Sequence, residues 1–417
     1  MKKITILTTL LTVSLLTGCQ DHELEPSPST LPQALGAWRT GGTGSDDIYS
    51  LARDPQGDLL MMGNQDGHFI AKYTNSGVIQ WKNDLKQIAD PSNKLVAVDA
   101  TGTIYIAHGN LGSRDDFGQS GEGAVYLASY TKDGTFRWIL SKTGSGSLLP
   151  VNIVTDEAGN TYMTGWFSGT VNFGSTELTS KSPDVKLGGR EDIFLLKVTK
   201  EGTLQWVKQL GGNSADFGFG LALDQAGNVF MSGFTASGPT FEGIDVNGYT
   251  SFAVKYTPDG TQQWIDAVRQ ANWGEGRHIG VDGAGNSYVQ TGAVTTKLNS
   301  NGGIEWHKET STVSDIVVSL NGDFYLAATF SGTKTIEGQT LTSSGGTDVM
   351  IAKYDKNGSL KWVIREGGLQ NEAVRKIVLG KGGIIHLLGT FEGTPTIAGT
   401  NLTSAGQTDN FVATYKE

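Results

Sequence analysis

The sequence predicts an all-β fold of seven repeated four-stranded units, because one tryptophan position and two polar turns recur along the chain. Seven of the nine Trp residues mark the recurring position, at spacings from 42 residues (Trp264 to Trp306) to 68 residues (Trp138 to Trp206). The seven are Trp38, Trp81, Trp138, Trp206, Trp264, Trp306 and Trp362. Self-similarity at such a period is typical of proteins that place one supersecondary unit after another.

Two tight turns define each repeat. In six repeats a polar turn with Gly at its fifth position leads into the Trp strand, as in YTKDGTFRW, which ends at Trp138. A second turn separates two apolar runs, as in Asp156–Asn160 (DEAGN) and Asp224–Asn228 (DQAGN). Gly supplies the positive φ that such hairpin turns require. Two hairpins make four antiparallel strands, and seven such units predict a seven-bladed β-propeller.

The Trp strand is expected to form the outer edge of each blade. It alternates apolar and polar residues, as in Leu204-Gln205-Trp206, whereas segments such as Phe252–Tyr256 are almost wholly apolar. Alternation indicates a strand with one solvated face. The last repeat stops at Phe411–Tyr415, which would normally precede a Trp strand. We therefore expect the N-terminal strand around Trp38 to close the last blade.

The N-terminus predicts secretion. Lys2 and Lys3 precede an uncharged run at residues 4–16, which as a helix would span about 20 Å, less than the roughly 30 Å of a hydrocarbon core. Residues 1–18 are therefore predicted to be a signal peptide. The propeller is expected to span residues 34–417.

Leu16-Thr17-Gly18-Cys19 is similar to the lipobox of bacterial lipoproteins. The resemblance implies that the Cys19 thiol carries a diacylglyceryl group, and acyl chains anchor a protein to a membrane. Residues 19–33 are acidic and contain Pro, so they are expected to form a flexible tether. Gln20 after the Cys implies the outer membrane, at its periplasmic or its surface face. The alternative is a signal peptide with an incidental Cys.

Net charge and cysteine content narrow the partners. The formal net charge is −10, and no cluster of basic residues offsets it, so nucleic acid is not expected as a partner. Cys19 is the only Cys, which leaves no disulfide to stabilise the fold.

The repeated phrases resemble the bacterial β-propeller-repeat proteins known as SBBP-repeat proteins. The fullest copy contains Gly211-Gly212, Asp216, Asp224–Asn228, Phe234, Phe252–Tyr256, Gly260 and Trp264. The resemblance covers about residues 36–417, although the second and fifth repeats depart from it. It implies a propeller of the cell envelope or the secreted space, and it implies no particular activity.

No catalytic residue, cofactor or metal is expected. No two His residues are three or four positions apart, and neither a Gly-x-Ser-x-Gly sequence nor a phosphate-binding loop occurs. Asp46, Asp216 and Glu372 each follow a Gly-Gly pair, where they could ligate Ca²⁺. We favour the other interpretation, that each caps turn amides.

The best candidate binding residues lie where the repeat is irregular. Trp273 stands close to Glu275, Arg277 and His278, and aromatic side chains beside charged groups often form glycan or peptide sites. The alternative is that Trp273 fills a short blade. The other irregular tryptophan, Trp166, is expected to pack.

The sequence therefore predicts a lipid-anchored envelope propeller that binds or scaffolds a protein or glycan and does not catalyse. One alternative is a propeller enzyme acting on glycans, a hydrolase or lyase, which would show three or more titratable groups in a deep pocket. The other is a structural subunit of an envelope assembly complex. The repeated Trp residues are expected to staple the blades, and truncating a fully buried one should cost roughly 3–5 kcal/mol.

Overall fold

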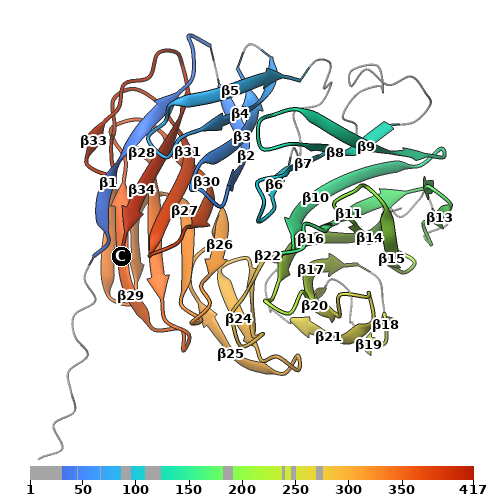
Figure 1. Cartoon of the computed structure of the whole chain (residues 1–417). Coiled ribbons are helices and arrows are strands. Elements are labelled where there is room, and N and C mark those ends of the chain that lie inside the picture. The colour runs from blue at the N-terminus through green and yellow to red at the C-terminus, as the bar shows by residue number, and fades with distance from the viewer. Residues whose placement is uncertain are drawn as a thin grey trace, which may run out of the picture. The chain divides into compact units, whose positions relative to one another are not determined.

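A computed structural model describes residues 31–44, 46–65, 67–85, 95–108, 124–181, 191–236, 240–245, 250–268 and 276–417. All of them belong to one compact unit, Leu31–Glu417. Every regular element that these residues form is a β-strand (Figure 1). Within the same ranges no helix is long and apolar enough to span a bilayer.

Seven antiparallel sheets form the blades of a β-propeller, which confirms the predicted fold. We name the blades A to G. Blade A contains β2 (Asp47–Arg53), β3 (Leu59–Asn64), β4 (His68–Tyr73) and β5 (Ile79–Asp84); blade B contains β6 (Leu95–Val98), β7 (Ile104–Ala107), β8 (Ala124–Tyr130) and β9 (Phe136–Thr143). Blade C contains β10 (Ser147–Thr155), β11 (Thr161–Ser168), β14 (Asp192–Val198) and β15 (Leu204–Leu210); blade D contains β16 (Asp216–Leu223), β17 (Val229–Thr235), β20 (Thr250–Tyr256) and β21 (Gln262–Val268).

The remaining blades follow the same order. Blade E contains β22 (Gly276–Val281), β23 (Ser287–Thr291), β24 (Val294–Leu298) and β25 (Ile304–Glu309); blade F contains β26 (Asp315–Val318), β27 (Phe324–Ile336), β28 (Gln339–Tyr354) and β29 (Leu360–Glu366). Blade G contains β30 (Glu372–Leu379), β31 (Ile384–Phe391), β34 (Asp409–Lys416) and, from the start of the chain, β1 (Gln33–Thr40). Two short hairpins lie in loops: β18 (Thr240–Phe241) with β19 (Ile244–Asp245), and β32 (Thr396–Ile397) with β33 (Thr400–Asn401).

One extension of a blade was not predicted. The hairpin of β12 (Thr170–Phe173) and β13 (Thr176–Thr179) leaves blade C and pairs with β9 of blade B. Blade B therefore belongs to a six-stranded sheet, and its Trp strand has a further neighbour on its outer side. The expectation that every Trp strand is an outer edge is wrong at β9, because this hairpin covers it.

The closing strand is confirmed. β1 pairs antiparallel with β34, and Trp38 lies opposite Val412. The opposing residues Phe411, Val412 and Ala413 are fully buried. Both strands of this closure lie inside Leu31–Glu417, and so do all seven hydrophobic clusters, so this unit contains the interactions that a separately folding domain needs.

A disulfide across the closure is expected to stabilise the propeller. The Ala37 amide donates to Thr400 Oγ1 at 3.1 Å, away from β34, so Ala37 and Ala413 form a non-hydrogen-bonded pair with Cα atoms about 4.5 Å apart. That separation suits a disulfide. In residues 31–417, the Ala37→Cys/Ala413→Cys variant should unfold about 2–4 kcal/mol later when oxidised than when reduced, measured by denaturant titration. The Ala37→Cys variant alone should show no such difference, and equal stability of both redox forms would contradict the pairing.

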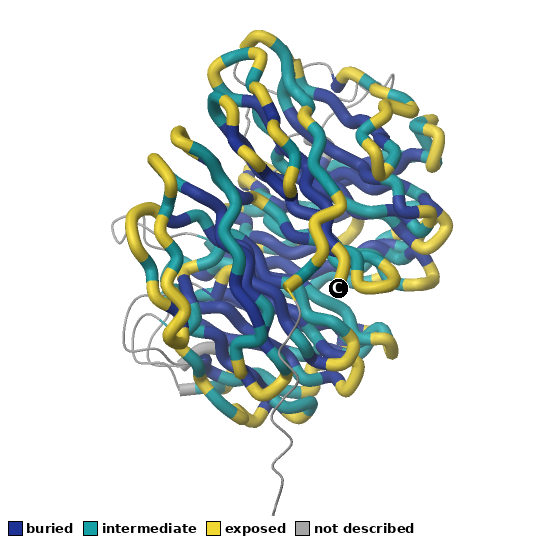
Figure 2. Tube along the Cα trace, turned by 90° about the vertical axis from the view of Figure 1, so that its left-hand side faces the viewer, coloured by how far each residue is buried: buried dark blue, intermediate teal, exposed yellow. Residues whose placement is uncertain are grey.

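The core lies between neighbouring blades. Leu60, Met62 and Ile70 of blade A pack with Ile104 and Ile106 of blade B, and all five are almost completely buried. Figure 2 shows buried segments through the middle of the strands and exposed ones at the turns. Face-to-face packing of blades explains why the middle strands are nearly uniformly apolar.

The repeated Trp residues connect successive blades. Trp138 Nε1 of blade B donates to the Lys200 carbonyl in the β14–β15 turn of blade C at 2.9 Å. A β-carbon on Gly202 of that turn would lie 2.8 Å from Trp138 Cδ2, and Gly202 has a φ of 88°. Trp81, Trp206 and Trp264 make the equivalent bond. The turn therefore needs Gly both for its backbone and to receive the indole.

Most of these indoles are only half-buried, so the cost expected for a fully buried Trp applies to Trp362, which is 2% exposed. Its Nε1 donates to the Glu417 carboxylate at 3.2 Å. Tyr325 and Lys353 also donate to Glu417. This carboxylate takes the place that a turn carbonyl has in the other blades.

A buried histidine predicts acid-sensitive stability. His386 on β31 is fully buried and shares a hydrogen bond with Thr414 Oγ1 at 3.1 Å. Burial, with repulsion from Arg53, lowers its pKa to about 4. The unfolded state binds a proton near pH 6.5 and the folded state only near pH 4, so folding stability falls as the pH drops through this window. The loss should reach about 3 kcal/mol.

Denaturant titrations at several pH values check this expectation. Between pH 7 and pH 4 the His386→Asn variant should lose about 3 kcal/mol less stability than the unmodified protein. Asn keeps a polar partner for Thr414 but takes up no proton. Parallel pH profiles for the two proteins would contradict the assignment.

Candidate ligand site in the axial cavity

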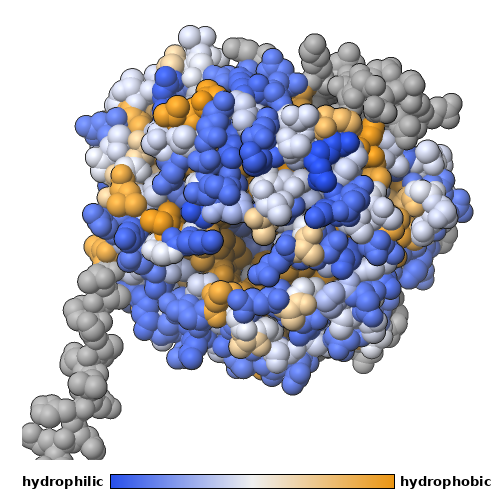
Figure 3. Space-filling model, in the orientation of Figure 1, coloured by the Kyte–Doolittle hydropathy of each residue, from blue (hydrophilic) through white to orange (hydrophobic). Residues whose placement is uncertain are grey.

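The first strand of every blade lines a cavity on the propeller axis, with a volume of about 550 Å³. These strands are β2, β6, β10, β16, β22, β26 and β30, each at the inner edge of its sheet. Figure 3 shows apolar residues around the hollow in the middle of the molecule. Pockets of this size, mostly apolar with a few polar groups, are the usual form of a ligand site.

One structural position of each blade contributes most of the polar groups. It lies four residues before the turn that joins the first two strands, a turn that begins at Asp54 in blade A and at Asp282 in blade E. We call these seven residues the cavity ring. They are Ser50, Leu95, Asn152, Gly220, His278, Asp315 and Lys376. All except Gly220 line the cavity.

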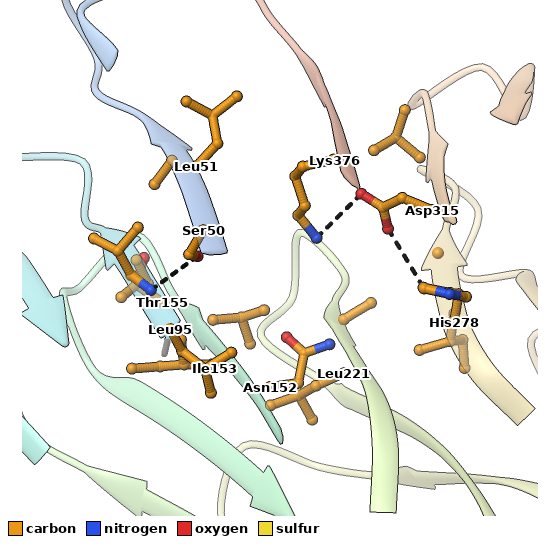
Figure 4. Close-up of a pocket in the computed structure, with 18 of the residues that line it drawn as sticks. Ser50, Leu51, Leu95, Asn152, Ile153, Thr155, Leu221, His278, Asp315 and Lys376 are labelled. Carbon is orange, nitrogen blue, oxygen red and sulfur yellow. Dashed lines mark hydrogen bonds and ion pairs between the residues drawn. The ribbon is translucent and has the colours of Figure 1, made fainter. Parts of the chain in front are cut away.

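Three successive members of the cavity ring interact, although they come from blades E, F and G. Asp315 Oδ1 lies 3.4 Å from His278 Nδ1, and Asp315 Oδ2 lies 3.1 Å from Lys376 Nζ (Figure 4). Burial alone would raise the pKa of Asp315. The Lys376 ammonium and the His278 hydrogen bond outweigh burial and hold that pKa below its ordinary value. Asp315 is therefore ionised at neutral pH.

The same residues also hold neighbouring blades together. Asp315 Oδ2 accepts a hydrogen bond from the Ile377 amide of the next blade at 3.1 Å. Ser50 Oγ accepts in the same way from the Val96 amide at 3.1 Å. Gly220 lacks this acceptor, and a β-carbon there would lie 2.8 Å from the corresponding amide of Ile279. Cavity-ring residues thus combine a structural bond with a polar surface.

The structure separates two of the predicted binding residues. Arg277 and His278 are adjacent on β22, and consecutive residues of a strand point to opposite faces. His278 faces Asp315 of blade F, whereas the Arg277 guanidinium lies 5.1 Å from the Phe219 ring of blade D. Trp273 and Glu275 lie outside the described residues.

Trp166 packs as expected, on the same side of blade E as Arg277. Its ring lies edge-on at 5.1 Å from Phe217 and 5.9 Å from Phe219. Trp166 and Phe217 stay partly exposed. With Arg277 they form a small aromatic and cationic surface over blades C, D and E.

The acids that follow the Gly-Gly pairs cap turn amides. Asp46 accepts from Gly42 N at 2.5 Å, Asp216 from Gly212 N at 2.7 Å, and Glu372 from Gly368 N at 2.8 Å. The capping interpretation is therefore supported at each position.

Cations at these junctions oppose a calcium site. Asp409, which lies near Asp46, pairs with Arg39 at 3.1 Å. Asp348, which lies near Glu372, pairs with Arg365. Among the described residues, no group of three or more His, Cys, Asp or Glu side chains is arranged to hold a metal ion.

Sequence reasoning missed Asp315, Lys376 and Asn152 as members of one site. They lie far apart in the chain, and none belongs to a recognisable catalytic sequence. The signal was their equal distance from the first turn of their blades. Aligning the repeats on that turn would have placed all seven cavity-ring residues together.

The architecture and cavity define a seven-bladed β-propeller protein with a polar cluster on its axis. The profile of the SBBP β-propeller repeat matches residues 205–239. Residues 205–239 are therefore an SBBP repeat, and the resemblance found in the sequence is confirmed. This stretch runs from β15 of blade C to the loop after β17 of blade D, so the sequence repeat spans two blades.

Solved structures show the same fold. A chain of the mitotic checkpoint complex aligns with a TM-score of 0.55 at 10% identity, covering 99% of both chains. BamB from Moraxella catarrhalis aligns at 0.45 and 9% identity, covering 93% of this chain and 100% of BamB. YCF48 bound to D1 peptide aligns at 0.48 and 12% identity, covering 93% and 98%. No curated protein sequence matches the chain. At these identities the likeness concerns the fold.

Proposed function

We propose that the protein is a lipid-anchored binding or scaffold module of the bacterial cell envelope, which holds a protein or glycan ligand and catalyses no reaction. The variation within the cavity ring carries this proposal. The turns and Trp residues are alike from blade to blade, whereas the cavity ring holds Ser, Leu, Asn, Gly, His, Asp and Lys. An asymmetric surface inside a repetitive scaffold suits the recognition of one asymmetric ligand.

Glycan and peptide arrays probed with residues 31–417 test the proposal. We expect a discrete set of ligands, and we expect the His278→Ala variant to lose binding while its melting temperature stays close to that of the unmodified protein. The matched control is His307→Ala, because His307 is exposed on the outer strand β25 of the same blade. Absence of any ligand, or equal loss in both variants, would overturn the proposal.

The anchor is tested separately. Cys19→Ser removes the thiol that the lipobox resemblance assigns to lipid attachment. The unmodified protein should sediment with bacterial membranes, and the variant should stay in the soluble fraction. Sedimentation of both proteins would overturn the lipid anchor and leave the binding proposal intact.

An enzyme is the second candidate, because the axial cavity meets the criterion set for it. His278, Asp315 and Lys376 are three titratable groups in one pocket. However, glycosidases commonly need two carboxyl groups, and Asp315 is the only acid among the described lining residues. Its oxygens already accept three contacts from the protein. Release of reducing or unsaturated sugar ends from a bound glycan, abolished by His278→Ala, would decide for the enzyme.

A further inference from the structure

Arg53 brings an unusual charge to the turn end of the axial cavity. It is the last residue of β2 and stands directly before the first turn of blade A. Its Nε and Cζ lie 3.1 Å and 3.2 Å from the position that a β-carbon on Gly380 of blade G would occupy. The guanidinium thus reaches across the junction of blades A and G. The equivalent residues in the other blades are uncharged: Val98, Thr155, Leu223, Val281, Val318 and Leu379.

This cation is not neutralised within the described part of the chain. The Nε of Arg53 is buried there without a hydrogen-bond acceptor, and no described carboxylate pairs with the guanidinium. Its neighbour His386 stays neutral above about pH 4. A half-buried guanidinium without an anionic partner carries a desolvation cost that a bound anion would offset.

The remaining charges of the cavity cancel. Lys376 pairs with Asp315 at 3.1 Å, which leaves Arg53 as the one unbalanced charge among the described lining residues at neutral pH. A single cation matches a monoanion better than a phosphate dianion. The planar guanidinium donates two parallel hydrogen bonds to a carboxylate.

The surrounding walls are apolar. Ile153, Leu221, Ile316 and Val317 line the same cavity. A second hollow of about 360 Å³ shares Thr155, Leu223 and Val281 with it and extends to the turns of blades C to F. A ligand at Arg53 would therefore have an apolar surface beside it and room to continue beyond the cavity.

From this arrangement we propose that the axial cavity binds a carboxylate attached to an apolar group, and that Arg53 is its anchor. The inference rests on the proposed function, because it specifies the ligand of the same cavity. A free organic acid and the C-terminus of a peptide both present this chemistry.

Saturation-transfer NMR with residues 31–417 tests the inference. The probes are hexanoate and hexanamide, a pentapeptide ending in Leu as the free acid and as the amide, and inorganic phosphate. We expect transfer to at least one acid at millimolar concentration and none to its matched amide. Binding of hexanoate identifies a small acid as sufficient, whereas binding of the peptide acid alone identifies a chain terminus.

Variants tie the result to Arg53. Arg53→Gln should weaken the dissociation constant of the acid by about tenfold or more, and Arg53→Lys, which keeps the charge but loses the fork, should weaken it less. The matched control is Arg375→Gln, because Arg375 is exposed beside Lys376, pairs with Asp47 at 2.8 Å and does not line the cavity. Equal binding of acid and amide, stronger binding of phosphate, or an unchanged Arg53→Gln variant would overturn the inference.

The two proposals fail in different ways. An array ligand whose binding survives Arg53→Gln, with no transfer to any acid, overturns the carboxylate inference and leaves the binding function standing. Acid binding through Arg53 with empty arrays overturns the protein or glycan ligand and leaves the carboxylate site standing. No binding in either experiment overturns both.

Discussion

A chain that begins at Gly41 is expected to lose the cooperative unfolding transition of the propeller. Without β1, the strand β34 becomes an open edge, and the buried residues Phe411, Val412 and Ala413 face solvent on that side. The Trp38 ring, which stacks at 5.2 Å on Tyr73 of blade A, is lost as well. Both blade G and its junction with blade A are weakened, so the loss should exceed about 5 kcal/mol, which is as much as many domains possess.

Thermal and denaturant unfolding of residues 41–417 beside residues 31–417 measures this effect. A peptide of residues 31–42 added in trans should restore part of the transition, because strand addition re-forms the main-chain bonds of an open edge. A shortened chain that melts close to the longer one would show that β1 contributes little to closure.

Trp362→Ala is expected to destabilise the propeller by roughly 3–5 kcal/mol, the range for removing a buried Trp. The indole is 2% exposed, lies 6.1 Å from the Tyr325 ring and donates to Glu417. Its removal would leave a cavity at the junction of blades F and G and free one donor of the Glu417 group. Denaturant titration with an unchanged m-value would report the loss as stability.

Trp81→Ala is the matched comparison. Trp81 occupies the same position in blade A and makes the equivalent bond, to the Lys132 carbonyl, but it is only half-buried. Its truncation should cost about half as much, since less apolar surface is returned to water. Equal costs for the two residues would show that the hydrogen bond, and not burial, decides the contribution of these tryptophans.

Much of the architecture could be predicted because its determinants are local. A Gly at a positive φ and a Trp four residues later recur in the chain because each blade needs the same turn and presents its indole to the next blade's turn. Counting these phrases gives seven blades, and the missing last Trp strand predicts the role of Trp38. The β12–β13 hairpin could not be predicted in the same way, because its pairing with β9 depends on where a loop folds in space.

The axial cavity was not predicted, for a related reason. Its polar residues lie on seven different strands, and each is surrounded in sequence by apolar neighbours that belong to the core. His278 was identified, but beside Arg277, because sequence proximity was the only guide. The pleat turns those two side chains apart, and packing of the blades brings His278 to Asp315 and Lys376 instead.

The pairing of the two ends of the described unit has a consequence for engineering. Gln33 faces Lys416 in blade G, as Ile79 faces Tyr73 in blade A across the turn of residues 74–78. A linker of similar length could therefore join these ends, and new termini could be opened at a Gly turn of another blade. Such circular permutants should fold, because the position of the seam among seven equivalent sectors is a property of chain connectivity and not of the packing.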